Sequence, residues 1–383
     1  METKNMGLYI HIPFCKRKCS YCDFISFSSK DSLIEGYVRA LKKEIEEFDF
    51  SKYNVTTIYL GGGTPSYIKE EYIKEILNLL KEKLVNNKVS WKYIEITIEV
   101  NPGTVTKEKL EIYKEVGVNR ISIGLQSTNN SLLKQIGRIH KFEDFLDTYN
   151  LAKEVGFDNI NVDLMIALPK QTIEDIKKSL GEIVSLSPNH ISVYSLIVEE
   201  GTLIEKQIEE GKIKLPSDEE ERRMYWYVKD FLELHGYKHY EISNFSKEGK
   251  ESKHNLNCWN QEEYIGFGLA AHSYIDGIRF CNTSNLEEYI DNIKNNSLCR
   301  NREVEERQKK EDKEKEFMML GFRKIEGVDI SKFKEKYGEN PIFLFRKELD
   351  KLVSEGLIEV DLNNIRLTNK GLDLANIVFE EFI

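Results

Sequence analysis

The sequence lacks the features that place a protein in a membrane or on nucleic acid. It has no run of 18 or more apolar residues, so it predicts no membrane-spanning helix. Its first residues do not resemble a secretory signal peptide. Positive charge is also scarce, because 55 Lys and Arg stand against 65 Asp and Glu, a formal net charge of −10. We therefore expect no nucleic-acid partner and at most peripheral contact with a membrane.

Cysteine is scarce as well, but its distribution is uneven. Three of the six cysteines, Cys15, Cys19 and Cys22, have the spacing C-x-x-x-C-x-x-C. An odd number without a secretory signal argues against disulfides and for a reducing, cytoplasmic location. The spacing favours an iron–sulfur cluster with one iron open to an outside ligand. Zinc is the next alternative, since His11 could complete a Cys₃His set, although His11 lies in an apolar run that predicts a strand.

Hydrophobic periodicity predicts an alternation of strands and helices over the first half of the chain. A chain of 383 residues with 40% hydrophobic and 31% charged residues is typical of a globular protein with two or three domains, or one large domain with an appendage. The expected strands are 7–13, 55–60, 93–100, 120–126, 159–168 and 190–199. The expected helices are 31–48, 67–84, 106–117, 142–155 and 172–186. Six such units, short of the eight of a closed barrel, predict an α/β fold with a partial (β/α)₆ barrel.

In such folds the functional site lies where the parallel strands end. The cysteine loop follows the first expected strand, and Gly61-Gly62-Gly63-Thr64-Pro65 follows the second. Glu99, Gln126 and Asp163 lie at or near the ends of the next three. The glycine run allows a ligand to approach the backbone, or it is simply a tight turn; it is not a P-loop. Together these residues predict a single site at one rim.

The cysteine spacing, with Tyr21 just before the third cysteine, resembles that of the radical S-adenosylmethionine (SAM) proteins. The preceding Tyr9-Ile10-His11-Ile12-Pro13-Phe14 narrows the resemblance to the oxygen-independent coproporphyrinogen III oxidase group and its haem-chaperone branch. The resemblance implies a [4Fe–4S] cluster on Cys15, Cys19 and Cys22, with SAM on the open iron. It also implies the partial barrel that the periodicity predicts.

The resemblance assigns further residues to SAM. It implies that Gly62, Gly63 and Thr64 bind the amino group of its methionine part. Tyr9 and Tyr21 would pack near the cluster and adenine. Family positions that hold the rest of SAM match Glu99, Gln126, Arg138 and Asp163. Alternatively, the two carboxylates are satisfied by backbone N–H groups, Arg138 is a solvated loop charge and the tyrosines belong to the core.

Two features of the sequence distinguish between the oxidase and haem-chaperone branches of this group. Phe24 stands where the oxidase pattern has a further cysteine, which argues against coproporphyrinogen oxidation. His254-Asn255-Leu256-Asn257-Cys258-Trp259 resembles the H-N-x-x-Y-W signature of the haem-chaperone branch, with Cys258 in place of tyrosine. This resemblance implies haem binding near His254 and transfer of haem to acceptor proteins. Without this resemblance, the simpler interpretation is that His254 and Asn255 form a polar turn and that Trp259 belongs to the core.

Other residues and functions stay open. Cys258 and His272 are further candidate haem ligands, although a satisfied buried histidine is the simpler interpretation of His272, and Cys281 and Cys299 are expected to be structural thiols. The first alternative function is a radical SAM coproporphyrinogen III dehydrogenase of porphyrin biosynthesis. The second is a zinc-stabilised barrel with neither activity.

The predicted domains are 1–235, the barrel with the cluster and SAM; 236–301, an extension with the His-Asn-x-x-x-Trp haem motif; and 302–383, a small winged-helix-like α+β domain. The charged stretch 302–316 reads as a solvated helix or connector. Helices at 330–337, 341–354 and 369–380 and a hairpin at 357–361 and 365–368 follow. Acidic residues offset the basic ones in the candidate recognition helix, 343–354, which argues against a DNA-binding domain. The family resemblance implies a lid or partner surface instead. Homodimer formation is left open.

Overall fold

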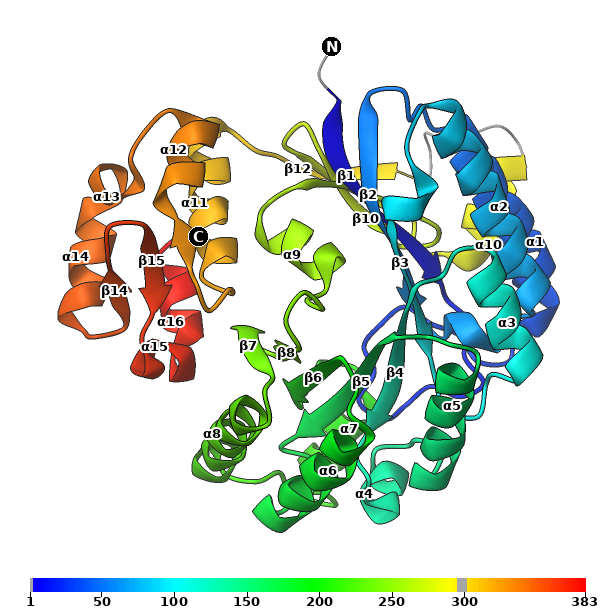
Figure 1. The fold of residues 1–383 in the computed structure, drawn as a ribbon, viewed down its shortest axis with the longest axis horizontal. Coiled ribbons are helices and arrows are strands. Elements are labelled where there is room, and N and C mark those ends of the chain that lie inside the picture. Colours follow the sequence, from blue (N-terminus) through cyan, green and yellow to red (C-terminus); the bar gives the residue numbers. More distant parts are fainter. Residues whose placement is uncertain (1–2, 295–301) are drawn as a thin grey trace.

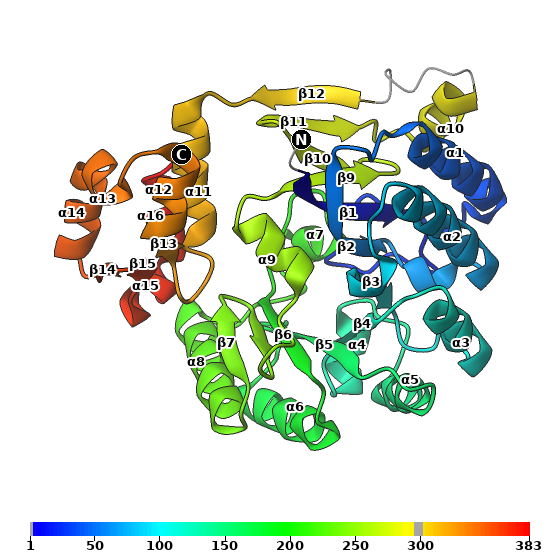
Figure 2. The ribbon, with the colours of Figure 1, turned by 45° about the horizontal axis from the view of Figure 1, so that its top comes forward.

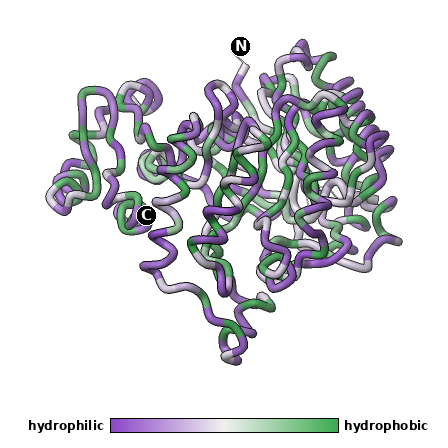
Figure 3. The backbone as a smooth tube through the Cα atoms, turned by 60° about the horizontal axis from the view of Figure 1, so that its bottom comes forward, coloured by the Kyte–Doolittle hydropathy of each residue, from purple (hydrophilic) through white to green (hydrophobic). Residues whose placement is uncertain are grey.

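The computed structural model describes residues 3–294 and 302–383 (Figures 1 and 2). Cys299 lies outside the described residues, so its role as a structural thiol stays a prediction. Within the described ranges, no helix has both the length and the apolar character needed to cross a membrane. Figure 3 accordingly shows hydrophilic and hydrophobic residues interleaved along the tube.

The centre of the fold is a parallel sheet of six strands in the order β1-β2-β3-β4-β5-β6. Each strand is followed by helical structure, which confirms the predicted partial (β/α)₆ barrel. The fourth strand has the predicted bounds, whereas the sixth ends earlier than predicted, at Ser195. The six are β1 (Lys4–Ile12), β2 (Tyr53–Gly62), β3 (Glu95–Val100), β4 (Arg120–Gln126), β5 (Asn159–Ile166) and β6 (His190–Ser195).

Helices cover the outer face of this sheet (Figure 1). Thr106 and Thr172 cap their helices as predicted, because each side chain accepts a hydrogen bond from a backbone N–H three residues on. Two short helices, α4 (Asn130–Gln135) and α7 (Leu203–Glu209), were not predicted. The larger helices are α1 (Ile34–Glu47), α2 (Glu70–Asn86), α3 (Lys107–Glu115), α5 (Phe142–Glu154), α6 (Ile173–Leu186) and α8 (Asp218–Leu234). Single 3₁₀ turns lie at Asp31–Leu33, Pro65–Tyr67 and Trp91–Tyr93.

The two faces of the parallel strands differ in polarity. In β4, Ile121, Ile123 and Leu125 join the hydrophobic core, while Arg120 and Ser122, which alternate with them, are buried polar residues. Because side chains alternate between faces along a strand, the apolar set packs under the helices and the polar set lines the interior of the barrel. The barrel interior therefore carries buried polar side chains that the helix-covered face lacks.

Six further strands extend the sheet at both edges. On one side, β9 (Glu263–Phe267) pairs parallel with β1, and β10 (His272–Ile275), β11 (Ile278–Asn282) and β12 (Arg302–Arg307) follow antiparallel (Figure 2). On the other side lie β8 (Asn244–Ser246) and β7 (Lys238–Glu241). The charged stretch predicted as a solvated helix or connector thus begins with an edge strand and continues into α11 (Lys310–Gly321).

Residues 236–301, predicted as a separate extension, supply β7 to β11 to the main sheet and two helices. Of these, α9 (Lys253–Trp259) carries the His254–Trp259 motif and packs against β2 and β9, while α10 (Leu286–Lys294) packs on α1. The proposed domain boundaries stay predictions.

A small C-terminal domain stands beside the barrel (Figure 1). Its three-stranded sheet, in the order β13-β15-β14, and its helices enclose a core with Phe317, Phe322, Phe333 and Phe345. Helices followed by a hairpin give it the predicted winged-helix-like form. After α11 come β13 (Val328–Asp329), α12 (Ile330–Tyr337), α13 (Pro341–Leu344), α14 (Arg346–Ser354), β14 (Ile358–Val360), β15 (Asn364–Leu367), α15 (Asn369–Asp373) and α16 (Ala375–Glu380).

A buried carboxylate joins the barrel to its extension. Glu44 of α1 accepts hydrogen bonds from Tyr289 Oη at 2.6 Å, Asn282 Nδ2 at 2.8 Å and the backbone N–H of Gly268 at 2.9 Å. These partners lie on α10, on β11 and in the turn after β9. Burial raises the pKa of Glu44. The carboxylate therefore satisfies three buried donors that come from three different elements.

We expect Glu44→Ala to lower the free energy of unfolding by at least about 3 kcal/mol, because it leaves these buried donors without their acceptor. Urea unfolding at neutral pH measures the loss. Glu46→Ala, at an exposed position of the same helix, is the control and should change stability by less than about 0.5 kcal/mol. Equal effects of the two substitutions would show that Glu44 does not hold the extension in place.

Candidate cluster and cofactor site

The cysteine loop leaves β1 and is held by backbone hydrogen bonds. Cys15 N–H donates to Phe27 O at 2.9 Å, and Ser20 N–H donates to Ile136 O at 3.1 Å. Cys15 is buried, while Cys19 and Cys22 are half-buried, and all three line one cavity. Burial raises the pKa of the Cys15 and Cys22 thiols. The loop thus presents three thiols to a common space, as its spacing predicts.

This cavity has a volume of about 340 Å³ and lies where β1 to β5 end. It brings together the cysteines and most of the residues that the sequence assigned to SAM. Its walls also contain Tyr59, Asn101, Ser122 and Tyr194, which the sequence analysis did not select. The predicted residues that line it are Tyr21, Gly62, Gly63, Thr64, Glu99, Gln126, Arg138 and Asp163, whereas Tyr9 and His254 do not.

The glycine run forms the wall next to the cysteine loop. Strand β2 continues into it, and Gly63 N–H donates to Ile12 O at 2.9 Å. Gly62 has φ = +110°, and a Cβ there would lie 2.6 Å from Cε1 of His11. A Cβ at Gly63 would lie 3.0 Å from Cys15 Sγ. Glycine fits here because the backbone at Gly62 lies against the His11 ring and the backbone at Gly63 lies against the cysteine loop.

A row of hydrogen bonds crosses the cavity wall from Arg138 to the thiols. Arg138 Nη2 donates to Asn101 Oδ1 at 2.8 Å, and Asn101 Nδ2 donates to Thr64 Oγ1 at 2.8 Å. Thr64 Oγ1 lies 3.5 Å from Cys15 Sγ, and Arg138 Nη1 lies 3.6 Å from Cys19 Sγ. Arg138 is therefore not a solvated loop charge. The sequence analysis missed Asn101, although its position just after β3, next to Pro102, was a usable signal.

Two carboxylates form the floor of the cavity. Glu99 Oε1 accepts a hydrogen bond from Tyr59 Oη at 2.9 Å, and burial raises the pKa of Glu99 to about 7. Asp163 accepts from Asn161 Nδ2 at 2.7 Å and from Ser122 Oγ at 3.2 Å, and burial raises its pKa too. Their partners are mainly side chains of the barrel interior. Both groups can accept further hydrogen bonds from a bound hydroxyl or ammonium group.

The structure places Tyr9 and His11 behind the cysteine loop. Tyr9 Oη is hydrogen-bonded to His11 Nδ1 at 2.9 Å, and His11 Nε2 is hydrogen-bonded to the carbonyl oxygen of Ile25 at 2.9 Å. Both ring nitrogens of His11 are therefore engaged away from the thiols. This geometry disfavours the Cys₃His zinc site, which needs one of them.

His254 lies apart from the cavity, on α9. Its Nδ1 is hydrogen-bonded to Thr57 Oγ1 at 2.9 Å, and its ring stacks on Tyr59 with a centroid distance of 5.1 Å. The side chain is buried. Tyr59 therefore contacts both the cofactor cavity, through Glu99, and the motif helix, through His254. The role of His254 as a haem ligand stays a prediction.

A second row of polar groups runs through the barrel interior to α9. Asn161 is hydrogen-bonded to both Asp163 and His190, the latter at 2.6 Å between Oδ1 and Nδ1. His190 Nε2 is hydrogen-bonded to Tyr240 Oη at 2.8 Å, and the same oxygen accepts from Ser252 N–H at 3.2 Å. Ser252 is the N-cap of α9. The floor of the cavity is thus connected by hydrogen bonds to the start of the motif helix.

Three thiols at a polar cavity on the carboxyl rim of a partial (β/α)₆ barrel define a radical SAM protein. The family model of the Radical SAM superfamily matches residues 9–183, and that of the HemN C-terminal domain matches residues 308–374. The chain is 41% identical to "Heme chaperone HemW" of Bacillus subtilis, with 98% of each chain covered. It is 37% identical to the protein of that name from Lactococcus lactis, over 100% of this chain and 98% of the relative. The chain therefore belongs to the HemW family of radical SAM proteins.

Among solved structures, coproporphyrinogen III oxidase (HemN) from Escherichia coli is similar with a TM-score of 0.84 and 25% identity. The match covers 100% of this chain and 90% of that one. The similarity extends over both the barrel and the C-terminal domain, so it supports the fold of the whole chain.

The residues of the cavity fit a [4Fe–4S] cluster and SAM, the groups that membership of the superfamily implies. Three cysteines with no disulfide supply three thiolates, which leaves one iron of such a cluster for an outside ligand. Among the described residues, nothing accepts a hydrogen bond from the buried Nε of Arg138. A carboxylate such as that of SAM would satisfy this donor.

The buried state of His254 predicts an acid-dependent loss of stability. Burial lowers the pKa of His254 to about 4, below its ordinary 6.5. As the pH falls, His254 is protonated in the unfolded chain before it is protonated in the folded chain. The contribution of neutral His254 to the free energy of unfolding is therefore complete above pH 6.5 and is lost as the pH falls toward 4. In urea unfolding between pH 7 and 4, we expect His254→Asn to reduce this loss by up to about 3 kcal/mol. His235→Asn, at an exposed position, should leave the pH dependence unchanged. The same change in both variants would mean that the pKa of His254 is not lowered in the folded chain.

Proposed function

We propose that this chain is a haem chaperone, which binds haem, carries one [4Fe–4S] cluster and SAM, and passes haem to acceptor proteins. The observation that carries the proposal is the 41% identity over 98% of the chain to a protein named as a haem chaperone. Phe24 adds support, because it lines the mouth of the cavity and is 63% exposed where the oxidase pattern has a cysteine. An exposed aromatic ring is suited to contact with a porphyrin rather than to metal ligation.

In this proposal Cys15, Cys19 and Cys22 hold the cluster, which supplies an iron with one open coordination position and the capacity for electron transfer. Arg138 pairs with the carboxylate of SAM, and Glu99 and Asp163 accept hydrogen bonds from its hydroxyl or ammonium groups. The close-packed backbone of Gly62, Gly63 and Thr64 faces the methionine part. Gln126 and Tyr21 line the same cavity and hold the remainder, while Tyr9 positions the loop through His11.

Haem ligation by His254 requires a rearrangement, because its ring is enclosed between Thr57 and Tyr59. Contacts with the C-terminal domain hold the end of α9. Lys324 Nζ donates to Asn260 Oδ1 at 2.7 Å, and Tyr337 Oη donates to Gln261 Oε1 at 2.5 Å. We infer that the C-terminal domain acts as a lid, and that its displacement together with α9 exposes His254 to haem.

We infer that the C-terminal domain contributes contacts to an acceptor protein. Phe343 of α13 is 76% exposed, and Leu362 in the β14–β15 turn is 96% exposed. Each offers one apolar side chain that a bound partner would bury. A cytoplasmic location and the absence of nucleic-acid binding stay predictions that rest on composition and charge, and homodimer formation stays open.

The second candidate function is coproporphyrinogen III dehydrogenase. The observation that favours it is the TM-score of 0.84 to a coproporphyrinogen III oxidase. Against it stands Phe24, at the position of the additional cysteine in that group. We therefore place it second.

The haem proposal predicts saturable binding of about one haem per chain. Haem is titrated anaerobically into the cluster-loaded protein and read by visible absorbance. His254→Ala should weaken binding at least about tenfold, since it removes the proposed iron ligand. Lys253→Ala, at an exposed position of α9 just before the motif, is the matched control and should retain haem.

The other outcomes assign the ligand or the function elsewhere. Saturation that His254→Ala leaves unchanged would contradict His254 and direct the test to Cys258→Ser and His272→Ala. Absence of any saturable haem spectrum would refute the chaperone function and make coproporphyrinogen oxidation the next assay.

SAM affinity should depend on pH through Glu99. Since its pKa is about 7 and the ionised carboxylate accepts hydrogen bonds from SAM, affinity should rise as the pH increases from 6 to 8 and then level off. Anaerobic equilibrium dialysis of labelled SAM with the cluster-loaded protein measures it. Glu99→Gln should flatten the profile, whereas Glu200→Gln, at an exposed rim position, should preserve it. A sloping profile that persists in Glu99→Gln would assign the titration to another group.

A further inference from the structure

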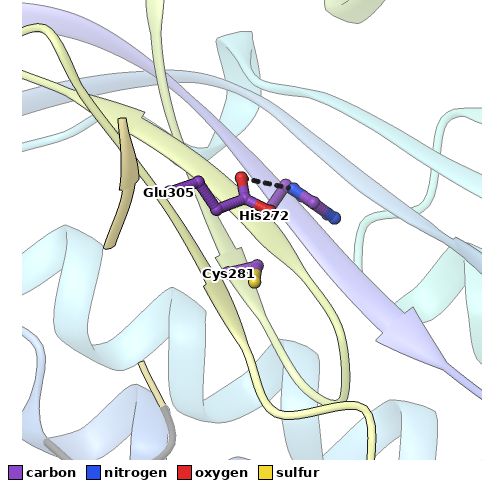
Figure 4. A group of neighbouring side chains, drawn as sticks. All are labelled: His272, Cys281 and Glu305. Atoms are coloured by element: carbon purple, nitrogen blue, oxygen red, sulfur yellow. Dashed lines mark hydrogen bonds and ion pairs between the residues drawn. The ribbon is translucent and has the colours of Figure 1, made fainter. Parts of the chain in front are cut away.

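A second group of potential metal ligands lies outside the cofactor cavity, on the extended edge of the sheet (Figure 4). His272 of β10 and Cys281 of β11 are directly opposite each other in an antiparallel pair, so their side chains share one face. Glu305 of the next strand, β12, reaches the same place. One ligand atom from each residue lies within 4.8 Å of the other two.

This group occupies the same rim of the sheet as the cysteine loop. Strand β9 runs parallel to β1, with Phe267 opposite Ile10, and the chain then turns into β10 at His272. The carboxyl end of β9 is therefore level with the end of β1, where the cysteine loop begins. None of the three residues lines the cofactor cavity.

We propose that His272, Cys281 and Glu305 bind one divalent transition-metal ion, with zinc as the best-matched metal. Nitrogen, sulfur and carboxylate oxygen are the ligand types that zinc takes in proteins, whereas calcium and magnesium prefer oxygen alone. With zinc bonds of about 2.0–2.3 Å in tetrahedral geometry, neighbouring ligand atoms lie about 3.3–3.6 Å apart. The observed 4.8 Å limit requires only small side-chain movements to reach this spacing.

The convergence of three ligands distinguishes an ion from haem. A haem iron already has four ring nitrogens and would take at most one protein ligand on this face. His272 and Glu305 are exposed and Cys281 is half-buried, so an ion has access from solvent. Three protein ligands also leave a fourth position open, as in zinc sites that bind water or a substrate.

The charges around Cys281 favour a cation. Glu303 is its cross-strand partner in β12, and Glu305 is hydrogen-bonded to His272 Nδ1 at 3.2 Å. These two carboxylates beside the thiol give this face a negative charge, which a bound cation would neutralise.

The test uses the full chain with its cluster assembled, so that the thiols of the cysteine loop are occupied. The protein is dialysed anaerobically against buffered Zn²⁺, and zinc and iron are both measured. We expect one zinc per chain in addition to the iron. His272→Ala, Cys281→Ser and Glu305→Gln should each lower zinc affinity at least about tenfold, with iron content unchanged.

Two matched controls separate this site from nearby groups. Glu306→Gln removes a charge from the same strand β12, and Cys258→Ser removes a thiol from α9; both should retain zinc. Should Cys281→Ser fail to fold, as judged by circular dichroism and iron content, the exposed positions His272 and Glu305 still decide the question.

Several results would overturn the proposal. The proposal is wrong if the protein binds iron but no zinc, or if all three ligand variants still bind zinc. It is also wrong if only Cys281→Ser loses zinc affinity, or if the control variants lose as much zinc affinity as the ligand variants. If zinc is absent and the visible spectrum of bound haem changes in the His272 or Cys281 variants, the group is a haem site instead. Since zinc is measured without haem or SAM, failure here leaves the chaperone proposal untouched.

Discussion

Parallel pairing between β1 and β2 brings the cysteine loop and the glycine run together. His11 lies opposite Gly61 and Ile12 opposite Gly62, and the contact continues beyond the strands through the N–H of Gly63 and the carbonyl of Ile12. At this spacing a Cβ at Gly62 would collide with the His11 side chain of β1, and a Cβ at Gly63 would press against Cys15 in the loop. The position of Cys15, and of the cavity beside it, therefore depends on the pairing of β1 with β2 and on the glycines at the end of β2.

The barrel interior is the second determinant. Its buried polar residues, unlike an apolar core, must satisfy one another's hydrogen bonds, and each bond fixes the orientation of two side chains. Asp163 is held through Asn161 and His190, and Glu99 through Tyr59. The same residues reach the motif helix α9. A ligand that changes the hydrogen bonding of either carboxylate acts on a network that ends at His254 and Ser252, which gives a physical route from cofactor to motif.

The C-terminal domain completes this arrangement. Its Lys324 and Tyr337 bind the residues that follow α9, and the Arg323 guanidinium lies 4.3 Å from the centroid of the Trp259 ring. The motif is thus enclosed between the barrel and the smaller domain. A chaperone must hold its cargo and release it, and a motif at a junction of two domains can be opened without unfolding either core.

The sequence by itself determined the six strands, the capped helices, the three closely spaced cysteines and the residues at the strand ends. These features depend on local periodicity and spacing, and parallel strands necessarily end at one rim. Only the tertiary structure decided that Asn101 joins Arg138 to Thr64, that His254 is enclosed, that the charged stretch at 302 begins as an edge strand, and that His272, Cys281 and Glu305 meet. Each of these depends on pairing between segments distant in the chain, which no local pattern encodes.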